Sequence, residues 1–176
     1  DLETRQPLRD DAIYRMASNT KIVTSVALMM LQERGLFELD DPLAKFLPEF
    51  GDMQVLQPNA NSATDVSPAA NFISVRHLLS HSAGLSYGFV EPDSLIDQTY
   101  LNNGVNGLGE QEIDLEELCL RIAKLPLAFE PGTSWRYSFA TDVCARLVEV
   151  LGGLPYDVVL RHSISDPVGM VGTDSW

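Results

Sequence analysis

Residues 15–35 read Arg15-Met-Ala-Ser18-Asn-Thr-Lys21-Ile-Val-Thr-Ser-Val-Ala-Leu-Met-Met-Leu-Gln-Glu-Arg-Gly35 and decide the fold. From Ile22 to Leu31 nearly every residue is apolar, and Ala, Leu and Met supply helix propensity. Gly35 is the residue type that commonly ends a helix in the left-handed conformation. The stretch therefore predicts a long helix that stops near Gly35. Because it is apolar on all sides, we expect it to be buried.

Ser18 and Lys21 stand at the head of this helix, one turn apart on one face. Burial disfavours an ammonium group, so we expect the pKa of Lys21 to fall. An amine that readily loses its proton beside a hydroxyl can make a serine nucleophilic. The first helical turn also carries unpaired N–H groups that can face an oxyanion. A bare S-x-x-K is common by chance, so this interpretation depends on a second segment.

That second segment surrounds Tyr137, which stands in a turn entering another predicted helix. Pro131-Gly132 is a turn signal. An apolar helical stripe follows and ends near Gly152 and Gly153; it consists of Val143, Leu147, Val148 and Leu151. Taken alone, a tyrosine beside a turn is usually an amphipathic core residue.

Together the two segments are recognisable. Ser18-x-x-Lys21 followed by Pro131-Gly132-Thr-x-Trp-x-Tyr137-Ser138 resembles the β-lactamase-related serine hydrolases: class C β-lactamases, D-Ala-D-Ala peptidases and family VIII carboxylesterases. Residues 39–43, 75–85 and 164–170 also match stretches that recur in this family. The resemblance implies a β-lactamase/transpeptidase-like fold of the α/β (α+β) class.

The resemblance also implies which part of that fold the chain represents. Residues 1–176 correspond to the central portion of one domain, truncated at both ends. The family's antiparallel sheet is built largely from the two ends, so we expect mainly the helical part here. The family's third motif, a Lys- or His-x-Gly on a strand, would lie beyond Trp176.

Carried over residue by residue, the resemblance makes Ser18 the acylated nucleophile and Lys21 its hydrogen-bond partner and proton acceptor. Tyr137, as a phenolate or in a relay with Lys21, would be the general base that later protonates the leaving group. A cationic neighbour favours the phenolate, which fits this pairing.

Phe139 departs from the family pattern and is the candidate substrate-binding residue. Family β-lactamases and peptidases usually have asparagine at this position, where its amide binds the substrate. An apolar ring cannot form that hydrogen bond, and a site without a needed polar partner discriminates against substrates that require it. We therefore predict a carboxylesterase-like serine hydrolase that acts on small esters through an acyl-enzyme. The alternatives are a β-lactamase or D-amino-acid peptidase, an acyltransferase of the same fold, and a penicillin-binding-like sensor or scaffold without turnover.

A rival enzyme motif is Gly84-Leu-Ser86-Tyr-Gly88, a literal G-x-S-x-G with His162 as a nominal partner. In α/β-hydrolases this serine needs a strand before it and a helix after it. Here a helical segment precedes Ser86 and a loop follows, so the context disfavours Ser86 as nucleophile.

Composition restricts the partners. The formal net charge of −13 argues against nucleic acid and anionic membrane surfaces, and no apolar run is long enough to span a bilayer. We expect a small-molecule ester or amide substrate and no cofactor. The histidines (His77, His81 and His162) lack metal-ligand spacing, so no metal site is predicted. Cys119 and Cys144 are expected to be buried and unpaired, which favours a reducing compartment only weakly.

The remaining chain is expected to consist of short helices and long loops. Helix starts are predicted at Ser74, Asp114 and Pro155, for helices running to His81, to Lys124 and towards His162. Residues 57–71 and 86–110 are expected to be loops, which are often functional when this long. Their aromatic residues either line a substrate pocket or anchor the loop; they are Tyr87, Phe89 and Tyr100.

Overall fold

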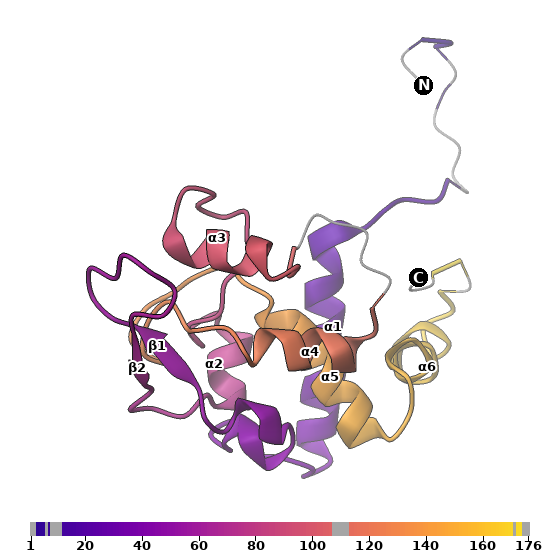
Figure 1. The fold of residues 1–176 in the computed structure, drawn as a ribbon. Coiled ribbons are helices and arrows are strands. Elements are labelled where there is room, and N and C mark those ends of the chain that lie inside the picture. Colours follow the sequence, from indigo (N-terminus) through magenta and orange to yellow (C-terminus); the bar gives the residue numbers. More distant parts are fainter. Residues whose placement is uncertain (1–2, 6, 8–11, 107–112, 171, 174–176) are drawn as a thin grey trace.

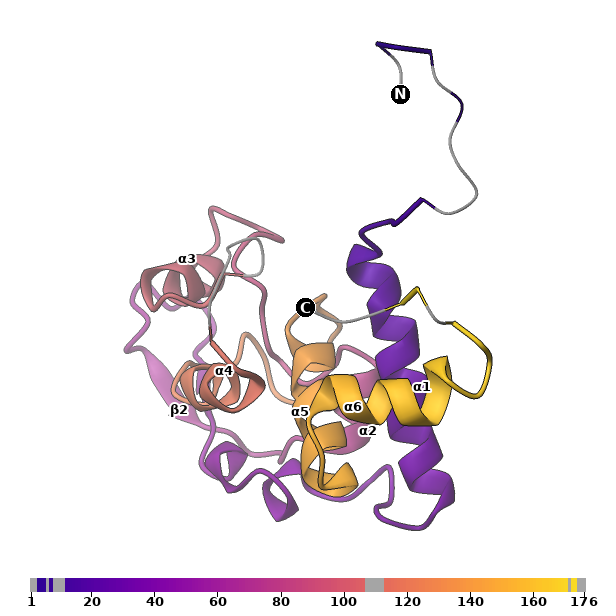
Figure 2. The ribbon, with the colours of Figure 1, turned by 90° about the vertical axis from the view of Figure 1, so that its right-hand side faces the viewer.

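The computed structural model describes residues 3–5, 7, 12–106, 113–170 and 172–173, and these form a mostly helical body (Figure 1). Helix α5 (Ala140–Gly152) lies at its centre. The helices packed against α5 are α1 (Thr20–Glu33), α2 (Val75–Leu79), α4 (Leu115–Ile122) and α6 (Tyr156–Leu160). A small hairpin and helix α3 (Leu95–Asn102) lie on the side of α5 away from α1 (Figure 2). Short 3-10 turns occupy Ala17–Asn19, Leu43–Lys45 and Pro48–Phe50, and a π turn, Arg161–Ser165, follows α6. The expected mainly helical architecture is confirmed.

Helix α5 owes its central position to its apolar stripe. Val143, Leu147 and Val148 are fully buried, as the sequence pattern predicts. The helix ends where Gly153 adopts φ +69°, a left-handed conformation that glycine takes without steric cost. This buried helix therefore fixes the position of the segment that leads into it, which contains Tyr137.

Helix α1 begins directly after the 3-10 turn that contains Ser18 and Asn19. Its end also follows the prediction: the helix stops at Glu33, and Gly35 has φ +74° and donates its N–H to the carbonyl of Gln32 at 2.8 Å.

The expectation that α1 is buried on all sides is wrong. Its buried residues are Thr24, Ala27, Leu28 and Leu31, which share one face. On the other face, Ile22 is 67% exposed and Val26 is 47% exposed. The reason is that α5 and α6 pack on one side of α1 only (Figure 2), and no described element covers the opposite side.

The predicted helix starts are correct, but two of the predicted ends are not. Ser74 caps α2 by accepting the N–H of His77, Asp114 caps α4, and Pro155 precedes α6. Helix α2 ends at Leu79 instead of His81, because His81 takes φ +54° outside the helix. Helix α4 ends at Ile122, short of the expected Lys124.

The two segments expected to be loops both contain regular structure. Strand β2 (Val66–Pro68) lies inside 57–71 and pairs antiparallel with β1 (Gln54–Leu56), with Val55 opposite Ser67. Helix α3 lies inside 86–110 and is capped by Ser94. A strand of three residues and a helix of eight are too short to give a clear hydrophobic period.

Candidate active site

The segment that carries Tyr137 is held along residues 81–86. Gly132, Arg136 and Phe139 each donate a backbone N–H to a carbonyl in 81–86, at 2.8, 2.9 and 3.1 Å. These bonds fix the chain on both sides of Tyr137. The position of its phenol is therefore set by backbone structure and not by the side chain alone.

A buried charged network reinforces this segment from the side of α3. The guanidinium of Arg136 donates to Asp97 at 3.0 Å, to Ser86 at 2.8 Å and to Glu91 at 2.7 Å. Ser86 also donates to Asp97, and both side chains are fully buried. The network thus links the loop after α2, helix α3 and the residue that precedes Tyr137.

The same network removes Ser86 from consideration as a nucleophile. Its hydroxyl is inaccessible to solvent, donates to a carboxylate and accepts from a guanidinium. The chain before Ser86 is not a strand, and the next helix, α3, begins only at Leu95, so Ser86 does not sit on a strand-to-helix turn. This burial agrees with the sequence context, which disfavours Ser86 as the nucleophile.

Ser18 and Tyr137 meet, although they lie 119 residues apart in the sequence. The hydroxyl of Tyr137 donates to Ser18 Oγ at 2.7 Å. Ser18 is exposed, so a substrate can reach it. Its backbone N–H belongs to the first turn leading into α1, where amides lack intrahelical acceptors and favour negative charge.

Lys21 lies between two tyrosine rings. Its Nζ is 5.1 Å from the ring centroid of Tyr87 and 5.3 Å from that of Tyr137, distances at which cation–π attraction operates. Lys21 donates to the hydroxyl of Tyr87 at 3.4 Å and lies 3.8 Å from Asp142 Oδ2. The structure brings Lys21 to the predicted site, but its hydrogen bond goes to Tyr87 and not to Ser18.

The expected fall in the pKa of Lys21 is wrong. Burial does disfavour the ammonium, but the carboxylate of Asp142 and the hydroxyls of Tyr87 and Tyr137 favour it more, and the pKa of Lys21 is raised. At neutral pH Lys21 is therefore an ammonium. A group that already holds its proton cannot accept the proton of Ser18, so the role of proton acceptor expected for Lys21 does not fit this charge state. The role of Tyr137 as general base stays a prediction.

Aromatic stacking fixes Tyr87. Its ring is parallel to that of Phe139, with centroids 4.3 Å apart, and stacks on Tyr137 at 5.5 Å. Phe139 is only 4% exposed and packs on its other side towards Tyr100, which is fully buried. Tyr100 thus anchors the loop, whereas Tyr87 reaches the site. Contact between Phe139 and a substrate stays a prediction; in the described structure its ring supports Tyr87.

Asp142 is the site residue that the sequence reasoning missed. It lies on α5, five residues after Tyr137, within a helix whose neighbouring residues Val143 and Cys144 are fully buried. A carboxylate in such a stripe is unusual, because buried acidic groups are normally paired. That local conflict was the available signal.

The next features are the two cysteines, possible metal ligands and possible membrane spans within the described residues. Cys119 and Cys144 are buried and unpaired, and burial raises the pKa of both thiols. The part of the chain that the structure describes holds no cluster of three or more His, Cys, Asp or Glu side chains suited to a metal ion. Within those same residues, no helix has both the length and the apolar character needed to cross a bilayer.

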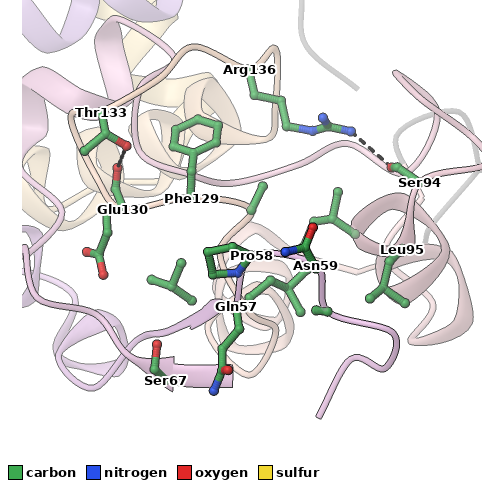
Figure 3. Close-up of a pocket in the computed structure, with 15 residues that line it drawn as sticks. Gln57, Pro58, Asn59, Ser67, Ser94, Leu95, Phe129, Glu130, Thr133 and Arg136 are labelled. Carbon is green, nitrogen blue, oxygen red and sulfur yellow. Dashed lines mark hydrogen bonds between the residues drawn. The ribbon is translucent and has the colours of Figure 1, made fainter. Parts of the chain in front are cut away.

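A separate cavity of about 640 Å³ lies between the β1–β2 hairpin and α3 (Figure 3). Its walls include Pro58, Leu95 and Phe129, but none of Ser18, Lys21 and Tyr137. Its charged groups are already paired: Arg136 with the network described above, and Glu130 with the backbone N–H groups of residues 70 and 71. The group formed by Ser18, Lys21 and Tyr137 is therefore distinct from this hollow, and Ser18 is open to solvent.

Comparison of the whole sequence with known protein families identifies the family of this chain. The Beta-lactamase family matches residues 1–176. The chain belongs to this family. Among Beta-lactamase relatives, it is 33% identical over 171 residues to the esterase EstB of Burkholderia gladioli, covering 97% of this chain and 40% of that protein. It is 33% identical over 168 residues to the acyltransferase CalJ of Penicillium decumbens, covering 93% of this chain and 38% of that protein.

Structural comparison agrees. The structure described as EstCE1, a hydrolase with promiscuous acyltransferase activity, superposes with a TM-score of 0.78 at 30% identity, covering 96% of this chain and 41% of that one. The β-lactamase/transpeptidase-like fold expected from the sequence is confirmed. The chain spans about two fifths of the length of these Beta-lactamase relatives.

Proposed function

We propose that this protein is a serine hydrolase that cleaves small esters through an acyl-enzyme on Ser18. The observation that carries the proposal is the 2.7 Å hydrogen bond between Tyr137 and an exposed Ser18, beside the ammonium of Lys21. A nucleophile and a group able to take its proton are thus hydrogen-bonded, and a cation lies over the ring of that group.

The steps follow from these contacts. Tyr137 first gives up its phenol proton to solvent, and its oxygen then accepts the proton of Ser18 while Oγ bonds to the ester carbonyl carbon. The negative charge moves to the carbonyl oxygen, near the amides of the first turn of α1. When the carbon–oxygen bond of the ester breaks, Tyr137 returns the proton to the departing alkoxide. Water then attacks the acyl-enzyme by the reverse path and releases the acid.

Two further observations support esters as the substrate class. The resemblance to the family implies that residue 139 is the position of an amide that recognises β-lactams or peptides, and here that residue is Phe139, buried against Tyr87. The family relative EstB is named as an esterase. Both favour an ester as the substrate class.

Active-site labelling tests the proposal. A fluorophosphonate should label Ser18 in the wild type, as located by peptide mapping, and should fail to label Ser18→Ala. Ser86→Ala is the matched control, because it removes a hydroxyl that solvent does not reach; a folded Ser86→Ala protein should still be labelled at Ser18. Absence of label on Ser18 in the folded wild type would overturn the proposal.

Acyl transfer is the second candidate, favoured by the names of CalJ and EstCE1. The acyl-enzyme is common to both reactions, and the acceptor decides the product. With p-nitrophenyl butyrate and an added alcohol, a hydrolase releases mainly butyrate, whereas an acyltransferase forms mainly the new ester. Product analysis at fixed p-nitrophenol release distinguishes the two.

A further inference from the structure

Asp142 is a partly buried acidic residue beside the proposed catalytic groups. Its carboxylate oxygen Oδ2 has no solvent contact and no hydrogen-bond partner among the described residues. The same oxygen lies 3.8 Å from Lys21 Nζ, so its one favourable contact is an ion pair. A charged carboxylate oxygen that is buried without hydrogen bonds destabilises the folded state. A nearby cation offsets that cost.

We propose that Asp142 is a positioning residue that holds the ammonium of Lys21 between Tyr87 and Tyr137, and thereby assigns proton removal from Ser18 to Tyr137. This inference rests on the proposed function. Asp142 touches neither Ser18 nor a substrate position; it acts through Lys21.

The geometry explains why one carboxylate has this effect. Lys21 projects from the first turn of α1 and Asp142 from the first turn of α5, and these two helices pack together. The ion pair therefore bridges the helix that bears the nucleophile and the helix that follows the base. With its Nζ drawn towards α5, Lys21 lies over the Tyr137 ring and bonds to Tyr87.

Several titratable groups face Lys21 from the surrounding elements, and they define how its charge responds to pH. Besides Asp142, they are Tyr87, Tyr137, His81, Tyr156 and Cys144. Asp142 is the carboxylic acid among these groups. Burial raises the pKa of Asp142 and Lys21 opposes that rise, so its charge depends on the same pair.

The main experiment compares kcat/KM for p-nitrophenyl butyrate against pH in wild type, Asp142→Asn and Asp142→Glu. The asparagine keeps the shape and removes the charge, so Lys21 should lose its proton at lower pH. We expect the alkaline limb of the profile to move down by about one to three pH units. Asp142→Glu should restore most of the wild-type profile. Glu116→Gln removes an exposed acid of α4 that pairs with Arg146 of α5, the helix that bears Asp142, and should leave the profile unchanged.

A direct titration covers the case in which Asp142→Asn fails to fold. The amine of Lys21 is followed by NMR in the wild type, with Lys21→Arg identifying its signal. A midpoint above that of free lysine supports the ion pair, and a midpoint below it overturns the inference. An unshifted alkaline limb in folded Asp142→Asn also overturns it.

These readouts separate the two proposals. If Ser18 of the wild type is never acylated, the proposed function fails, while the Lys21 titration still decides whether Asp142 holds the ammonium. If Ser18 is acylated and the Lys21 titration or the mutant profile disagrees, only the role of Asp142 fails.

Discussion

The ring of Tyr87 lies parallel to the ring of Phe139, with 4.3 Å between centroids and an interplanar angle of 0°. This stack fixes the phenol so that its hydroxyl meets Lys21 at 3.4 Å. Tyr87 is therefore an organised part of the candidate active site, although it lies in an irregular stretch before α3, as the sequence predicts. Its hydroxyl and its ring have separate roles that substitutions can separate.

Tyr87→Phe keeps the stacked ring and removes only the hydroxyl. The hydrogen bond that is lost, from Lys21 Nζ to the Tyr87 hydroxyl, is long. Its contribution to the free energy should therefore be near the lower end of the usual range of about 1.5–3 kcal/mol for a hydrogen bond to a charged group. We expect kcat/KM for p-nitrophenyl butyrate to fall about tenfold with the melting temperature almost unchanged. Tyr87→Leu, which also removes the ring, should lower both. Equal activity in wild type and Tyr87→Phe would exclude a role for the hydroxyl.

Lys21 and Tyr137 should behave as one unit. Lys21→Ala removes the cation and Tyr137→Phe removes the proton acceptor, and each should slow acylation of Ser18 by several orders of magnitude. Because both act on the same proton transfer, the double variant should be little slower than either single variant. Stopped-flow measurement of the p-nitrophenol burst gives the three rates. Multiplicative effects would indicate that the two residues act in different steps.

Asp97 should control the stability of the segment that positions Tyr137. Asp97→Asn leaves the half-buried guanidinium of Arg136 with one acidic partner, Glu91, which is largely exposed. Breaking a buried ion pair costs about 3–5 kcal/mol, and the remaining partner favours the lower value. Urea unfolding should report this loss. Asp93→Asn, an exposed acid in the same loop, should change the free energy of unfolding by less than about 0.5 kcal/mol.

The same residue gives the stability a defined pH dependence. Burial alone would raise the pKa of Asp97, but hydrogen bonds from Ser86, the amide of Glu91 and Arg136 lower it below its ordinary value. A pKa that is lower in the folded state stabilises the protein above the unfolded value of about 4. That contribution disappears as pH falls through the lower, folded value. Unfolding measured from pH 7 to pH 2 should therefore show a smaller acid loss in Asp97→Asn than in wild type.

The residues that meet in the candidate site could be predicted where the sequence carries a motif. Ser18, Lys21 and Tyr137 each stand beside a helix start, and the structure places all three together. The pairing of Asp142 with Lys21, and with it the charge of Lys21, could not be predicted, because both depend on how α1 packs against α5. The exposed face of α1 could not be predicted either, since apolar composition alone does not say which neighbours cover a helix.

The choice between ester and β-lactam substrates should be measurable at residue 139. In the wild type, kcat/KM for p-nitrophenyl butyrate should exceed that for nitrocefin, because the buried ring of Phe139 offers no amide to the substrate. Phe139→Asn should raise the nitrocefin-to-butyrate ratio by about tenfold, the value of one modest hydrogen bond. It should also destabilise the protein by several kcal/mol, as large-to-small changes do in a packed core.

Phe139→Leu is the matched control for that substitution. It also disrupts the stack on Tyr87 but supplies no amide, so its nitrocefin-to-butyrate ratio should stay at the wild-type value while overall activity falls. A similar rise in both variants would mean that loosening the stack, and not the amide, admits the β-lactam. If the wild type already prefers nitrocefin, residue 139 does not determine the substrate class and the ester assignment fails, although acylation of Ser18 with Tyr137 as base would stand.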